Sequence, residues 1–116
     1  MNNQILEKLS KSKFRSSFHL RKYMIDYINK NGIDKIREHA YEFINTRIRP
    51  KEIVNDGQQT PMKGHPVFIA QHACACCCRS CLEKWHHVPK GKELNDAEVE
   101  YIVNLLMEWI NREYKK

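Results

Sequence analysis

Hydrophobic residues recur along this chain at intervals of three and four, the spacing that places side chains on one face of an α-helix. The clearest early stripe predicts a helix from about Phe18 to Asn29 and consists of Leu20, Tyr23, Met24, Tyr27 and Ile28. Ser16 or Ser17 is suited to cap the start of this helix, and Asn31-Gly32 is a suitable stop.

Further stripes predict more helices on either side. The next helix is expected from about Asp34 to Ile48, with Pro50 ending it. The last is expected from Asn95 to about Glu113, because Asn95 followed by Glu98 is a capping-box pattern. A short amphipathic turn at the start contains Ile5, Leu6 and Leu9. The pattern therefore predicts an all-α fold of four to five helices in one domain spanning residues 1–116.

Residues 51–66 interrupt this helical pattern. They contain Asn55-Asp56-Gly57, Pro61, Gly64 and Pro66 and show no helical or strand period. Long irregular loops in compact domains are often functional. This one leads directly into the part of the chain that carries the most distinctive chemistry.

All five cysteines lie in the run from Cys74 to Cys81, with His86 and His87 following. Cysteines this close together cannot tie distant parts of a chain through disulfides. Thiols beside imidazoles instead match the ligand preferences of zinc. The sequence therefore indicates a metal site made of cysteine and histidine, and the candidate ligands are Cys77, Cys78, Cys81, His86, His72 and His65.

The fold of residues 67–88 decides which of these ligands can meet. One straight helix would offer a metal only two ligands at spacings of three or four, so a break near Cys76 to Cys78 suits a site better. A helix from about Cys78 to His87 would then begin with thiols at its positive end. An iron–sulfur cluster on Cys74, Cys77, Cys78 and Cys81 is the less favoured alternative. Cysteines that simply pack in the core are a further alternative.

A catalytic role rests on residue types alone. Cys77 or Cys78 with His72 would form a thiolate–imidazole pair, and Asp56 or Gln71 is suited to orient an activated water. The common hydrolase and phosphate-binding signatures are absent from the sequence. Whether the chain is an enzyme, of hydrolase type, is therefore left open beside binding and adaptor roles.

Charge adds a second hypothesis. The net charge is +6, and the stretch from Lys8 to Lys22 is basic without any acidic residue. A basic segment of this kind attracts polyanions, so nucleic acid is a candidate partner. The residues that would contact it are Lys11, Lys13, Arg15, Arg21 and Lys22, with residues 1–12 forming a flexible basic arm.

Two further expectations concern location. The longest apolar stretch, Val67 to Ala70, is far shorter than the roughly 20 residues that span a bilayer. The start of the chain also lacks the features of a signal peptide. We therefore expect a cytoplasmic protein without a membrane partner, in which cysteines stay reduced.

Four segments of the chain, residues 13–18, 55–62, 64–73 and 77–86, carry a resemblance to a known family. Over about Ser12 to Ile110 the chain resembles small bacterial and phage proteins of domain-of-unknown-function family 4186. In that family Thr often stands where this chain has Cys74 and Cys76, so the resemblance favours a mixed Cys/His site over a four-thiolate cluster. It also directs attention to the loop residues Asn55, Asp56, Gln59 and Thr60. The resemblance implies no activity.

Overall fold

The computed structural model describes residues 2–116, and every regular element in this range is helical. Met1, with which the expected N-terminal arm starts, lies outside the described residues. The elements are α1 (Asn2–Ser10), a 3₁₀ turn η1 (Arg15–Ser17), α2 (Lys22–Asn31), α3 (Ile33–Phe43), a π-helical turn η2 (Ile44–Ile48), α4 (Pro66–Ala73), α5 (Arg79–His86) and α6 (Asp96–Tyr114). The predicted all-α class is confirmed, with six α-helices in the described range rather than four to five.

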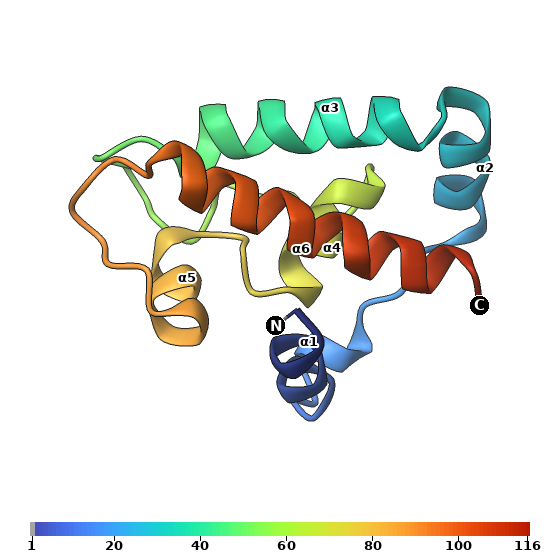
Figure 1. The fold of residues 1–116 in the computed structure, drawn as a ribbon, viewed down its shortest axis with the longest axis horizontal. Helices are drawn as coiled ribbons and strands as arrows, with labels where there is room; N and C mark the ends of the chain where they lie inside the picture. The colour runs from blue at the N-terminus through green and yellow to red at the C-terminus, as the bar shows by residue number, and fades with distance from the viewer. Residues whose placement is uncertain (1) are drawn as a thin grey trace.

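Helix α6 is the longest element and crosses the middle of the molecule (Figure 1). It contacts α1, α3 and α4, and α5 lies to one side of it. Its inner face, including Ile102, Leu105, Leu106 and Ile110, has no exposed surface. Burying such side chains stabilises the fold by about 1.5–3 kcal/mol each, so α6 anchors the core.

The predicted start of α6 is confirmed in detail. The Asn95 side chain accepts a hydrogen bond from the Glu98 amide, and the Glu98 carboxylate accepts one from the Asn95 amide. This reciprocal pair satisfies backbone N–H groups that have no partner inside the helix. The local sequence therefore determines where this helix begins.

The predicted start of the helix at Phe18 is wrong. Helix α2 begins at Lys22, its N-cap is Arg21, and Ser16 and Ser17 lie in η1 instead. Phe18 is extended, and the Leu20 amide donates to the Glu113 carboxylate at 3.3 Å. Tertiary contacts thus hold residues 18–21 out of a helix.

The segment expected as an N-terminal arm is packed against the domain. Residues 2–10 form α1, and Leu6 and Leu9 on it are buried in the core. The expected helix to Ile48 is present as α3, but it ends at Phe43 and continues as the π-helical turn η2. Pro50 lies two residues beyond the end of η2, in keeping with the predicted stop.

None of the described helices is both long enough and apolar enough to cross a membrane. The predicted irregular stretch is confirmed, because no helix or strand lies between η2 and α4. The predicted break in the cysteine segment is also confirmed. Helix α4 ends at Ala73 and α5 begins at Arg79, so the cysteines lie mostly in the connection between two short helices.

Candidate metal centre

Three thiols meet where the α4–α5 connection enters α5. Ala75 adopts a left-handed conformation, with a φ of 58°, which turns the chain sharply after α4. Cys78 is the N-cap of α5, and its sulfur accepts a hydrogen bond from the Cys81 amide at 3.4 Å. As a result the Sγ atoms of Cys77, Cys78 and Cys81 all lie within 4.8 Å of one another.

An arginine from a distant part of the chain completes this cluster. Arg15, in η1, is only 8% exposed, and its guanidinium donates to the sulfurs of Cys81 at 3.1 Å and Cys77 at 3.6 Å. The same group donates to the His72 carbonyl at 2.7 Å, which fixes its orientation. A buried cation in contact with two thiols favours a negative charge on the sulfurs.

The three thiols do not ionise equally. Hydrogen bonds from Cys77 and Cys78, together with the Arg15 guanidinium, lower the pKa of Cys81. Hydrogen bonds with Cys78 and Cys81, and burial, raise the pKa of Cys77. Cys81 is therefore the sulfur that carries the first negative charge, and it is also the most exposed of the three. A metal ion would supply the further positive charge that the other two need to ionise.

The long loop holds the cysteine segment in place. The Thr60 hydroxyl donates a hydrogen bond to the Cys77 carbonyl at 2.8 Å. Gln71 donates to the Cys76 carbonyl and to the Thr60 hydroxyl, both at 3.2 Å. Because both side chains are buried, these bonds are shielded from water and fix the backbone that carries Cys77.

Asp56 anchors the other side of the cluster, at the start of α5. Its carboxylate accepts hydrogen bonds from the amides of Arg79 and Ser80, the Ser80 hydroxyl and the Gln59 side chain. Burial alone would raise the pKa of Asp56, but these hydrogen bonds bring it below its ordinary value. Asp56 therefore acts as a capping anion at the positive end of α5 and supports the Cys78–Cys81 turn.

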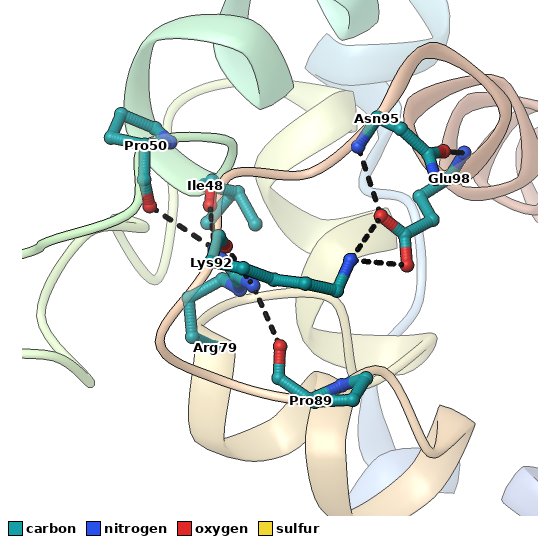
Figure 2. Close-up of polar contacts among 7 residues, drawn as sticks. All are labelled: Ile48, Pro50, Arg79, Pro89, Lys92, Asn95 and Glu98. Atoms are coloured by element: carbon teal, nitrogen blue, oxygen red, sulfur yellow. Dashed lines mark hydrogen bonds and ion pairs between the residues drawn. The ribbon is translucent and has the colours of Figure 1, made fainter.

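Arg79 ties the cluster to the rest of the domain (Figure 2). It is 4% exposed and donates to the carbonyls of Ile48, Pro50, Pro89 and Lys92 at 2.9–3.3 Å. These carbonyls belong to η2, the segment after it and the connection from α5 to α6. Arg79, which lies between Cys78 and Cys81 in the sequence, thus links three separate segments around α5.

None of the three candidate histidines belongs to the Cys77–Cys78–Cys81 group, and each has other partners. His65 caps α4, because its Nδ1 accepts from the Val67 amide at 3.0 Å, and its Nε2 lies 3.0 Å from Nδ1 of His39. Burial and the neighbouring His39 lower the pKa of His65 to about 4. His65 is therefore a neutral structural residue in this arrangement.

The other two histidines bond to backbone carbonyls. Nε2 of His72 lies 3.1 Å from the carbonyl oxygens of Thr60 and Pro61, and its ring stacks on Phe18. Nε2 of His86 lies 2.8 Å from the Cys74 carbonyl oxygen. A nitrogen that donates to a carbonyl cannot also take a proton or bind a metal. The proposed Cys77–His72 catalytic pair thus does not form through Nε2.

Cys74 and Cys76 have no exposed surface and belong to the hydrophobic core. A four-thiolate iron–sulfur cluster would need Cys74 beside Cys77, Cys78 and Cys81. Among the described residues, the group close enough to share an ion contains only those last three. The arrangement therefore fits a mononuclear ion with three protein ligands and a fourth position left for another donor.

The basic residues of the N-terminal region divide into two groups. Lys11, Lys13, Arg21 and Lys22 are exposed, as the nucleic-acid hypothesis requires. Arg15 is not, because its guanidinium is buried against the thiols, so its assignment to a nucleic-acid surface was incorrect. In the sequence, Arg15 is one positive charge among several, and no pattern distinguishes Arg79 from the other arginines. The sequence feature that could have drawn attention to Arg15 and Arg79 is their position in segments 13–18 and 77–86, which carry the family resemblance.

No solved structure matches the chain. The family described as Domain of unknown function (DUF4186) matches residues 3–111. Because this match covers nearly the whole length, the chain belongs to that family.

Proposed function

We propose that this protein binds one zinc ion through Cys77, Cys78 and Cys81. The observation that supports the proposal is the convergence of the three sulfurs within 4.8 Å beside the buried Arg15 guanidinium. Zinc binds thiolate sulfur at about 2.3 Å, so small side-chain rotations bring the sulfurs into its coordination shell. A reducing compartment such as the cytoplasm would keep these thiols available.

Three protein ligands leave one coordination position for water or an external donor. Structural zinc sites use four protein ligands, whereas sites that act on a substrate commonly use three. The three-thiol cluster thus favours a metal site that can bind a substrate or other external ligand, rather than the closed structural site that the Cys/His pattern suggested. Arg15 would balance the charge of three thiolates on a divalent ion and hold Cys77 and Cys81 in position.

A cobalt titration tests this proposal. The metal-free, reduced protein is titrated with Co²⁺, whose thiolate charge-transfer absorption reports sulfur ligation, and Zn²⁺ is then added as a competitor. We expect one equivalent of Co²⁺ per chain, displaced by Zn²⁺. The Cys81→Ser variant should lose the charge-transfer band, whereas Cys74→Ala, which removes a buried thiol outside the cluster, should keep it.

Two results would count against the site. A wild-type protein without a thiolate band has no such centre. A band that persists in Cys77→Ser, Cys78→Ser and Cys81→Ser alike would place the metal elsewhere. Circular dichroism of each variant checks that it is folded.

Nucleic-acid association is a second candidate, and it rests on residues exposed from the end of α1 to the first turn of α2. Lys11, Lys13, Arg21 and Lys22 are accompanied by two aromatic rings, with Phe14 54% and Tyr23 50% exposed. Basic side chains with exposed rings suit single strands, since the rings stack on bases while the cations contact phosphates. Anisotropy of a labelled single-stranded oligonucleotide should fall as salt rises, and the salt slope should decrease when Lys11 and Lys13 become Gln. Oligonucleotide binding that does not depend on salt would refute a nucleic-acid role for these basic residues.

A further inference from the structure

Cys78 and Cys81 stand one helical turn apart at the start of α5. The sulfur of Cys78 lies over this turn, because it accepts the hydrogen bond from the Cys81 amide. Residues separated by one turn fall in the Cα range of about 4.4–6.8 Å that a disulfide needs. Their sulfurs already lie within 4.8 Å of each other. The pair can therefore close a disulfide with little movement of the backbone.

The two sulfurs differ in how far an outside molecule can reach them. Cys81 is half-buried, while Cys78 is only 5% exposed. Arg15 holds the Cys81 sulfur from one side at 3.1 Å and would balance its charge during a reaction. An incoming disulfide thus meets Cys81 first, and Cys78 is placed behind it as the resolving thiol.

Cys77 is less suited to this second role. Its sulfur is already held by the Arg15 guanidinium, which donates to it at 3.6 Å. The backbone at Cys77 is also fixed, because its carbonyl accepts the buried hydrogen bond from Thr60 at 2.8 Å. Cys77 is therefore a third metal ligand without a place in the redox pair.

We propose that Cys78 and Cys81 form a dithiol–disulfide pair that reduces low-molecular-weight disulfides. The Cys81 thiolate attacks one sulfur of the disulfide, forming a mixed disulfide and releasing the first thiolate. The Cys78 sulfur loses its proton to solvent and attacks Cys81, which forms the Cys78–Cys81 bond and releases the second thiolate. The protein gives up two electrons and two protons, and the small disulfide becomes two thiols. This chemistry uses metal-free protein and does not depend on zinc.

Glutathione disulfide is the probe that tests this sequence of steps. The reduced, metal-free protein is incubated with it, quenched by alkylation, cleaved with trypsin without reduction and analysed by mass spectrometry. Trypsin cuts after Arg79, which separates Cys78 from Cys81, so the predicted bond appears as two peptides joined by a disulfide. We expect this product in wild type and in Cys74→Ala.

The Cys78→Ser variant is the decisive arm. Serine is a good N-cap, so α5 should still form, but no resolving thiol remains behind Cys81. We expect a lasting glutathione adduct on Cys81. A lasting adduct on wild-type Cys81, or joined peptides that persist in Cys78→Ser, would overturn the assignment. The glutathione disulfide assay contains no metal, so a negative result there would not contradict the zinc proposal. A negative cobalt titration would likewise not contradict the dithiol–disulfide proposal.

Discussion

Replacing Arg79 by Met should strongly destabilise the domain while keeping the length of its side chain. The guanidinium is 4% exposed and bonds to four carbonyls from three segments, as Figure 2 shows. Without it, those carbonyls lose their partners, at a cost of about 1 kcal/mol per bond when the oxygens can regain water and more when they cannot. Pro89 and Lys92 are exposed and Ile48 is buried, so water would reach some of these carbonyls but not all.

The expected loss is therefore about 3–5 kcal/mol of unfolding free energy, a large part of the 5–15 kcal/mol typical of a domain. For a chain of this size it corresponds to a fall in Tm of roughly 15 °C. Urea unfolding followed by circular dichroism gives the free energy. Lys84→Met is the matched control, because Lys84 is an exposed cation on the same helix and should change stability by less than about 0.5 kcal/mol. A loss below about 1 kcal/mol in Arg79→Met would refute the structural role assigned to this side chain.

Two further predictions concern His65 and Asp56. The folded state holds His65 neutral, with a pKa of about 4 against about 6.5 when unfolded, so the unfolded chain binds more protons between these values. The free energy of unfolding should be at its full value above pH 6.5 and fall by roughly 1–2 kcal/mol between pH 7 and pH 5. Urea unfolding at both pH values should find a smaller loss in His65→Asn. An equal loss in the variant would contradict the role of His65 in the pH dependence. Asp56→Ala removes the carboxylate that caps α5 and should cost about 1–2 kcal/mol. Hydrogen exchange at the Arg79 and Ser80 amides should accelerate, and unchanged protection there would show that Asp56 is not the cap.

The elements that could be predicted are those that local sequence specifies. The start of α6 depends on Asn95 and Glu98, which lie three residues apart and cap each other. The start of α2 could not be predicted in the same way. Leu20 continues the apolar stripe but bonds to Glu113, a residue at the other end of the chain. A contact between distant parts of the chain therefore overrides the local pattern.

The candidate site follows the same rule. The cysteines are close in sequence, so their grouping and the break before α5 could be anticipated. The histidines could not be placed, because the partner of each depends on tertiary structure: His39 for His65, the loop carbonyls for His72, and the Cys74 carbonyl for His86. Burial of Arg15 depends on the docking of η1 against α4, which no local pattern encodes.

The most direct test of the zinc site is elemental analysis of the purified, untagged protein, with thiols counted before and after chelation. We expect about one zinc per chain in wild type and in Cys74→Ala, a loss of zinc in Cys81→Ser, and three thiols that become reactive when zinc is removed. Metal-free wild-type protein that stays metal-free when zinc is offered, or zinc content unaffected by Cys81→Ser, would contradict it.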